Sequence, residues 1–113
     1  MPSSVWFRIA RTNHLMQRGG RCHYCREPLT CAQVTADHKI PRSRGGKNQM
    51  ANIAACCFAC NQAKADKTES RFFAEMGKSK PSSADPNVLA AYIRRRINKK
   101  VNRACERIME ACR

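Results

Sequence analysis

The sequence predicts a small α+β domain in which a metal site supplements a limited hydrophobic core. Two Cys-x-x-Cys pairs, Cys22/Cys25 and Cys57/Cys60, enclose a stretch with two short strand-like segments. Segments with helical spacing of apolar residues lie on both sides of this stretch. The chain has 113 residues, of which 6% are aromatic. The core must therefore be small, and a stabilising metal is expected.

The spacing of the cysteine pairs indicates which metal. Each pair places two thiolates three residues apart, which is typical of zinc sites. Four sulfur ligands complete a tetrahedron, so we expect a structural Zn²⁺ that does not contact substrate. A disulfide scaffold is the alternative for eight cysteines. Arg8 and Arg11 interrupt the N-terminal apolar run, so no secretory signal is expected and a reducing cytoplasm is favoured.

The charge balance indicates a polyanionic partner. The formal net charge is +14, from 22 Lys and Arg against 8 Asp and Glu. Nucleic acid is the commonest polyanion that such proteins bind. A basic surface kept only for solubility is an alternative, although acidic residues serve solubility better. No segment approaches the ~18 apolar residues of a membrane span, so no membrane partner is expected.

The first predicted element is a basic helix within residues 1–21. It should run over residues 4–18 and lean on the first cysteine pair. Its expected apolar face comprises Val5, Ile9 and Met16. Trp6 and Phe7 are its largest apolar side chains, and we favour core packing over base stacking for both.

Two strands are predicted between the cysteine pairs, over residues 32–38 and 52–55. A basic loop over residues 41–51 should connect them. The first strand delivers Asp37 and His38 side by side. Because adjacent strand residues point to opposite faces, both can serve one site only if the chain twists there.

Helices are predicted after the second strand. One begins at Cys57 and carries Cys60, Asn61 and Lys64 on neighbouring turns. The next begins with Thr68 as its cap. Its expected buried residues are Phe72, Phe73 and Met76, and its end is at Gly77.

Residues 78–85 have the composition of a linker, and residues 86–113 should form one long amphipathic helix. Its apolar stripe comprises Leu89, Ile93, Ile97, Val101, Ala104, Ile108 and Cys112. Its other face carries Arg94, Arg95, Arg96, Lys99, Lys100, Arg103 and Arg107. We favour a DNA-contact surface over a merely solvated face, because these charges repel one another without a polyanion.

Further residues of the motif occur at fixed spacing between and after the cysteine pairs. They are Asp37-His38, Pro41, Ser43, Gly45-Gly46, Asn52 at fourteen residues after His38, and Asn61 and Lys64 following Cys60. With the cysteine pairs, this pattern resembles that of the HNH endonuclease family, in the variant whose final position is Asn. The resemblance covers residues 22–64. It implies a ββα-metal (His-Me finger) core in a zinc-bound treble-clef setting.

The resemblance also implies roles for individual residues. His38 would be the general base, since a neutral imidazole can take a proton from water near neutral pH. Asp37 and Asn61 would hold a divalent cation, Mg²⁺ or Mn²⁺, through oxygen atoms. Asn52 would close the loop through backbone hydrogen bonds and orient His38. His14 and His23 lack this context, and we interpret both as structural.

Two neighbouring cysteines compete for one ligand position. The family places this ligand five residues after its Asn, which selects Cys57 over Cys56. We interpret Cys31, Cys105 and Cys112 as small buried apolar groups. Cys105 and Cys112 could instead lie at a dimer seam.

Basic residues near the predicted site are expected to contact DNA phosphates, which position the backbone without reading sequence. They are Arg42, Arg44, Lys47, Lys64 and Lys67, joined by Arg95 and Lys99 on the last helix. The sequence thus predicts a nuclease domain over residues 22–77, flanked by basic helices.

The favoured function is a metal-dependent DNA endonuclease in the cytoplasm of a prokaryotic or phage-infected cell. A zinc-stapled nucleic-acid-binding module without catalysis is the alternative. A third interpretation is an adaptor that forms a homodimer through the helix over residues 86–113.

Overall fold

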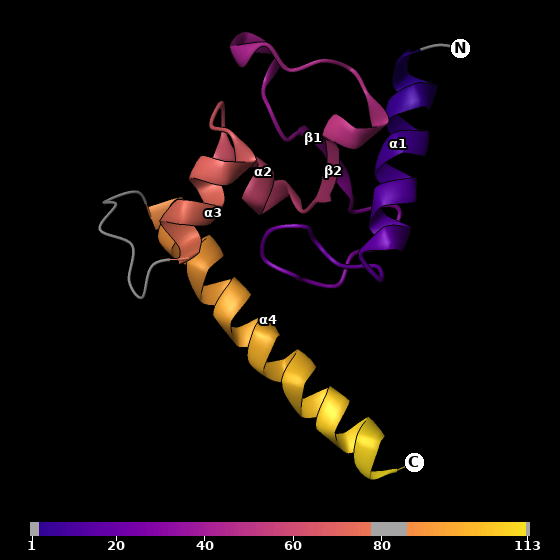
Figure 1. Cartoon of the computed structure of the whole chain (residues 1–113), viewed down its shortest axis with the longest axis vertical. Helices are drawn as coiled ribbons and strands as arrows, with labels where there is room; N and C mark the ends of the chain where they lie inside the picture. Colours follow the sequence, from indigo (N-terminus) through magenta and orange to yellow (C-terminus); the bar gives the residue numbers. More distant parts are fainter. Residues whose placement is uncertain (1–2, 78–85, 113) are drawn as a thin grey trace.

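The computed structural model describes residues 3–77 and 86–112, with principal extents of 46 × 36 × 20 Å. Figure 1 shows a body formed by the first three helices and a two-stranded sheet, from which the last helix extends. The elements are α1 Ser3–Gln17, β1 Thr35–His38, β2 Ile53–Cys56, α2 Phe58–Lys64, α3 Glu69–Gly77 and α4 Pro86–Ala111. This arrangement confirms the predicted α+β class.

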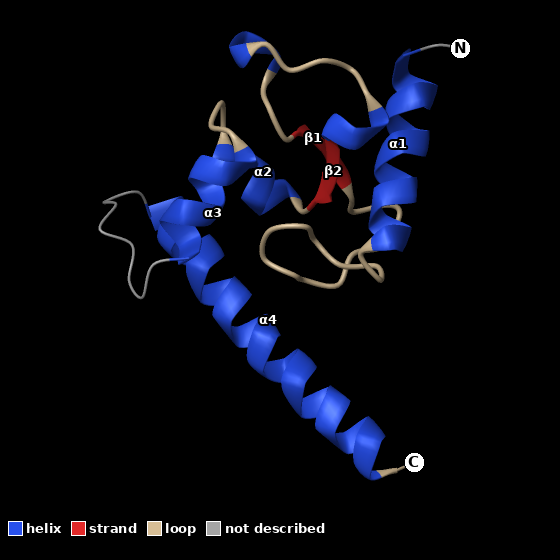
Figure 2. Ribbon diagram, viewed as in Figure 1, coloured by secondary structure: helices blue, strands red, loops and turns tan. Residues whose placement is uncertain are grey.

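The sheet is the centre of the body. β1 and β2 pair antiparallel, with Asp37 opposite Ala54 and His38 opposite Ile53. All four residues of β2 are buried. Helix α1 packs against both strands, and α2 lies on the other side of them (Figure 2). β1 is shorter than predicted, because residues 31–33 form a turn, and β2 is shifted by one residue, because residues 50–52 form a 3-10 helix.

The buried face of α1 differs from the predicted one. Val5, Ile9 and Met16 are exposed, whereas Ala10, His14 and Leu15 are buried. The helix packs on the sheet, and His14 also meets the ring of His23, inside the first cysteine pair, at 4.9 Å. His14 Nδ1 accepts a hydrogen bond of 2.9 Å from the backbone nitrogen of Ala55. A polar side chain of α1 thus faces the strand. The apolar face predicted from hydropathy is therefore not the buried face of this helix.

Helices α2 and α3 begin as their sequences predict. The Cys57 sulfur caps α2 by accepting a hydrogen bond from the Cys60 backbone nitrogen. Thr68 Oγ1 caps α3 by accepting one from the Arg71 backbone nitrogen. Phe72 and Met76 of α3 are buried, and Phe73 is partly buried beside them.

Helix α4 has the predicted length but packs through a different face. Its buried residues are Val88, Ala91 and Tyr92. Ile93, Ile97 and Val101 of the predicted stripe are exposed by 47%, 55% and 48%, respectively. The first half of α4 contacts α2, α3 and the loop that carries Cys25, while the second half projects beyond the body (Figure 1). The predicted linker over residues 78–85 lies outside the described residues.

The projection of α4 corrects one prediction about the cysteines. Cys105 and Cys112 are exposed rather than buried, because they lie on the projecting half. Cys31 is exposed in the turn before β1. Among the described helices, none is both long and apolar enough to cross a membrane.

Candidate active site and metal centre

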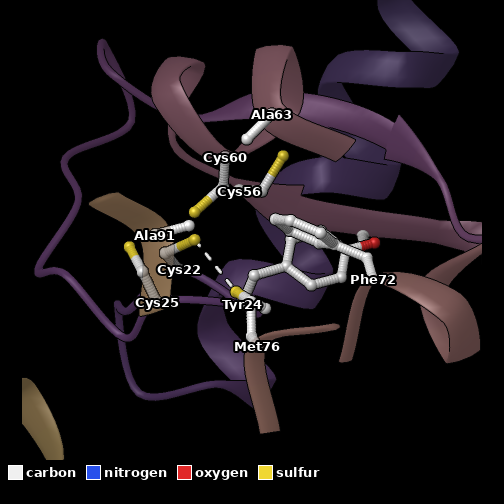
Figure 3. Close-up of a cluster of buried hydrophobic side chains, with 10 residues drawn as sticks. Cys22, Tyr24, Cys25, Cys56, Cys60, Ala63, Phe72, Met76 and Ala91 are labelled. Carbon is white, nitrogen blue, oxygen red and sulfur yellow. Dashed lines mark hydrogen bonds between the residues drawn. The ribbon is translucent and has the colours of Figure 1, made fainter. Parts of the chain in front are cut away.

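Four cysteines meet in the core. The sulfur atoms of Cys22, Cys25, Cys57 and Cys60 all lie within 4.8 Å of one another. The first two come from the loop after α1 and the last two from the start of α2. Figure 3 shows three of them among the buried side chains, with Ala91 of α4 beside the sulfurs. The loop and α2 are thus joined at this cluster.

The cluster fits a tetrahedral Zn²⁺. Sulfurs at ~2.3 Å from a tetrahedral centre are about 3.8 Å apart, and the Cys25 and Cys57 sulfurs are 3.7 Å apart. Backbone N–H groups of Tyr24 and Cys57 donate to the Cys22 sulfur, each at 3.4 Å. Hydrogen bonds from the other three thiols, Cys25 first, hold the pKa of the Cys22 thiol well below its usual range. The donor set is therefore soft and closed.

The structure decides between the two neighbouring cysteines. Cys57 belongs to the cluster, whereas Cys56 lies on β2 with its sulfur 3.4 Å from Thr35 Oγ1. Burial raises the pKa of the Cys56 thiol, which keeps it protonated. The prediction that Cys57 is the ligand agrees with this geometry.

Asp37 lies in a pocket on the other side of α2 and is only 6% exposed. The Tyr24 hydroxyl donates to its Oδ2 at 2.6 Å, and the Lys64 ammonium contacts its Oδ1 at 3.2 Å. Burial raises the pKa of Asp37, while these two partners oppose the shift. Each carboxylate oxygen thus has one protein partner and retains acceptor capacity for another.

Lys64 corrects a prediction made from the sequence. Its side chain is fully buried rather than available to a DNA backbone. The ammonium also donates to the backbone oxygen of His38 at 2.9 Å. Because Lys64 follows Asn61 by one helical turn on α2, it points toward β1, where it neutralises Asp37. Lys64 is therefore part of the framework of the pocket.

His38 follows Asp37 at the end of β1, and its partners come from the loop and from α1. Its Nε2 lies 2.8 Å from Asn48 Oδ1 in the loop, and its ring meets the Phe7 ring of α1 edge-on at 5.7 Å. An amide oxygen only accepts, so Nε2 carries the proton and Nδ1 is the free basic nitrogen. The contacts from Asn48 and Phe7 fix the orientation of this imidazole.

The loop between the strands is closed by Asn52. Its side chain accepts from the Ile40 nitrogen and donates to the oxygens of Ile40 and Lys47, at 2.9, 3.1 and 3.0 Å. Gly46 is required for space, since a Cβ there would lie 1.7 Å from the Ile40 oxygen. The backbone hydrogen bonds agree with the loop-closing role expected of Asn52, while its role in orienting His38 stays a prediction.

Asn61 lies on α2 near the start of β1. Its Nδ2 donates to Thr35 Oγ1 at 3.2 Å. Asn61, Asp37 and His38 all line one open pocket of about 280 Å³. The other lining residues are Ala36, Pro41, Arg42, Lys64 and Ala65. The pocket thus combines oxygen donors, an imidazole and a cationic rim.

The remaining predicted phosphate contacts differ in availability. Arg42, Lys47 and Lys99 are exposed. Arg44 is exposed and donates to the Asp66 oxygen, while Lys67 pairs with Glu75 at 2.9 Å. Arg95 is half-buried and donates to the Tyr24 oxygen, with its guanidinium 5.0 Å from the Phe73 ring centre. Arg95 is thus used to dock α4.

Sequence reasoning missed three supporting residues. Tyr24 holds Asp37, Asn48 holds His38, and Thr35 holds Asn61. Tyr24 lies inside the first Cys-x-x-Cys pair, and the spacing of that pair gives no sign of a contact with Asp37. Asn48 lies in a loop whose path no local pattern determines. Thr35 could have been predicted from the sequence, because it lies two residues before Asp37 on a strand and therefore on the same face.

Comparison with known proteins gives three results. Residues 22–76 match the family model described as HNH endonuclease. A CRISPR-associated endonuclease Cas9 of Corynebacterium diphtheriae is 34% identical over 55 residues, which are 48% of this chain and 5% of that protein. The crystal structure of the Type II-C Cas9 enzyme from Actinomyces naeslundii is similar with a TM-score of 0.51 and 20% identity. The latter match covers 79% of this chain and 12% of that chain. This chain therefore spans a small part of each relative's length.

Proposed function

Because residues 22–76 form a domain of the HNH endonuclease family, we propose that this chain is a metal-dependent endonuclease that hydrolyses DNA phosphodiester bonds in the pocket of Asp37, His38 and Asn61. The observation that carries the proposal is that these three residues line one open pocket. A module that only binds nucleic acid would not require a base and two oxygen ligands at one place.

In this proposal His38 is the general base. Its Nε2 proton is directed to Asn48, which leaves the Nδ1 lone pair to accept a proton from water. The Phe7 ring on one side limits rotation of the imidazole. General-base catalysis of this kind contributes roughly 10²–10⁴-fold to a rate.

Asp37 and Asn61 would hold the catalytic cation. The amide nitrogen of Asn61 is used by Thr35, so its oxygen is the atom left for a metal. A carboxylate and an amide oxygen are hard donors that suit Mg²⁺ or Mn²⁺. When bound, such an ion would offset the negative charge that develops on the phosphate and the leaving oxygen.

The substrate assignment rests on charge. The net charge of +14 favours a polyanion. Exposed basic side chains at the pocket rim, including Arg42, would contact phosphates on either side of the cleaved bond. Lys99 on α4 offers a second contact in this proposal.

Incubation with supercoiled plasmid tests the proposal. The wild type should convert the plasmid to nicked or linear form in Mg²⁺ or Mn²⁺, and a chelator should stop the reaction. His38→Ala should cut roughly 10²–10⁴-fold more slowly, with unchanged zinc content, melting and DNA binding. Asn48→Ala should lose less activity, because it removes only the partner that orients the base. Cleavage by His38→Ala at the wild-type rate would favour the binding-module alternative.

A further inference from the structure

Helix α4 contacts both halves of the cysteine cluster through polar side chains. Arg94 Nη2 lies 3.4 Å from the Cys60 sulfur. Asn98, one turn later, donates to the Cys25 backbone oxygen at 2.9 Å and to Glu27 Oε1 at 3.2 Å. Arg95 donates to the Tyr24 oxygen. These side chains thus contact both the loop that carries Cys22 and Cys25 and the helix that carries Cys60.

The small size of Ala91 permits this approach. Ala91 is fully buried and belongs to the same core cluster as Cys22, Cys25 and Cys60. It lies one turn before Arg94 and Arg95, so the helix axis comes close to the sulfurs at this point (Figure 3). The guanidinium of Arg94 is consequently held against the cluster, and its buried Nε has no hydrogen-bond partner among the described residues. Arg94 is partly buried, and a cation partly removed from water is stabilised by a nearby anion.

The cluster supplies that anion when it holds zinc. Zn²⁺ with four thiolates carries a net charge of about −2. Three of the four cysteines are buried, so this charge is partly removed from water. We propose that Arg94 is a positioning residue of the metal centre, whose charge-assisted hydrogen bond to Cys60 retains the zinc and couples its binding to the docking of α4.

This role differs from the one that the sequence suggested. The basic residues of α4 appeared there as one DNA-facing group, but Arg94 and Arg95 face the body. The inference depends on zinc in the cluster and not on the nuclease proposal. Its failure would leave the plasmid experiment unaffected, because it is tested through the metal alone.

Zinc release is the first test. The full-length, zinc-loaded protein is mixed with excess chromogenic chelator, and the rate of transfer is followed. Arg94→Gln should release zinc about ten- to a hundred-fold faster than the wild type, in the range typical of lost outer contacts to metal ligands. The matched control is Arg96→Gln, since Arg96 bonds Tyr92 on the same helix and not the cluster. Equal release rates for the two variants would overturn the proposal.

A spectroscopic test separates this role from simple packing. In protein loaded with Co²⁺, a hydrogen bond to a thiolate raises the energy of the sulfur-to-metal charge-transfer band. Arg94→Gln should therefore shift this band to lower energy, whereas Arg96→Gln should not. Arg94→Lys keeps the charge and the aliphatic stem, so it remains usable should Arg94→Gln fail to fold, and it should fall between wild type and Arg94→Gln. A wild-type band and release rate in Arg94→Lys would also contradict the proposal.

Discussion

The cysteine cluster and the Asp37 pocket both take residues from α2, but they hold their polar groups in different ways. Cys60 and Asn61 are consecutive, yet Cys60 belongs to the cluster and Asn61 lines the pocket. The cluster is closed and made of sulfur. The pocket is open and made of oxygen and nitrogen. Under the proposed function, one short helix would thus serve a soft metal site and a hard one.

The difference lies in what fixes each site. In the cluster, the four ligands themselves join the loop to α2. In the pocket, each key side chain is held by a partner from another segment, as Asp37 is by Tyr24. Damage to the cluster should therefore unfold the domain, whereas damage to the pocket should leave it folded.

The largest expected effect is loss of a cluster ligand. Cys57→Ser should abolish stoichiometric zinc and cooperative melting, because zinc binding at a structural site contributes roughly 10–16 kcal/mol to folding. Cys22→Ser should behave alike. Cys31→Ser is the matched control, since Cys31 is exposed and outside the cluster. Retained zinc in Cys57→Ser, measured by elemental analysis with thermal melting, would contradict the assigned ligand set.

A smaller effect is expected in the loop over the pocket. Gly46→Ala would place a methyl group against the Ile40 oxygen, so the loop must open and the support of His38 by Asn48 is lost. We expect a cost of about 3 kcal/mol in unfolding free energy, with zinc retained, measured by urea unfolding. Gly77→Ala is the control, because nothing lies within 4 Å of a Cβ there. Equal stability of both variants would show that the loop adapts.

The pH dependence of the unfolding free energy should reflect the burial of His14, whose ring hydrogen-bonds β2. Burial, with nearby positive charges, lowers the pKa of His14 from 6.5 to about 4. Between these values the unfolded chain binds the proton and the folded chain does not, so stability falls as pH falls. His14→Asn keeps an acceptor for Ala55 without titrating. The wild type should lose about 2 kcal/mol more than His14→Asn between about pH 7 and 5. If the unfolding free energies of the two proteins, measured in urea, changed equally with pH, this assignment would be contradicted.

The smallest effect concerns backbone strain at the pocket. Ala65 ends α2 with φ 51° and ψ −129°, a region that favours glycine. Ala65→Gly should stabilise the domain by about 1 kcal/mol. Ala59→Gly, at an exposed position of the same helix, should instead destabilise it by roughly 0.5–1 kcal/mol. Thermal melting compares the two, and destabilisation by both would remove the argument for strain.

The cluster was predictable from the sequence because metal ligands have a fixed local spacing. Cys57, rather than Cys56, followed from its distance to Asn52 and to Cys60. The order of strand, loop, strand and helix was predictable for a similar reason, since each element has its own local pattern. Thr68 and Gly77 marked α3 correctly.

The packing faces of the outer helices were not predictable from hydropathy. Helix α1 turns His14 inward to bond β2, and α4 turns Arg94 and Asn98 toward the cluster. Local patterns place polar residues outside, whereas these find their partners only after the chain has folded. Lys64 was wrongly predicted to contact DNA for the same reason, because its partner Asp37 is distant in sequence.

The central claim is that α2 carries consecutive residues to two metal sites with separate tasks. Its most direct test is the Mg²⁺ dependence of plasmid cleavage by Asn61→Ala, with zinc content measured on the same sample. The account predicts wild-type zinc content and a cleavage rate that is low at ordinary Mg²⁺ and partly restored by raised Mg²⁺. Loss of zinc from Asn61→Ala, or a wild-type dependence on Mg²⁺, would contradict it.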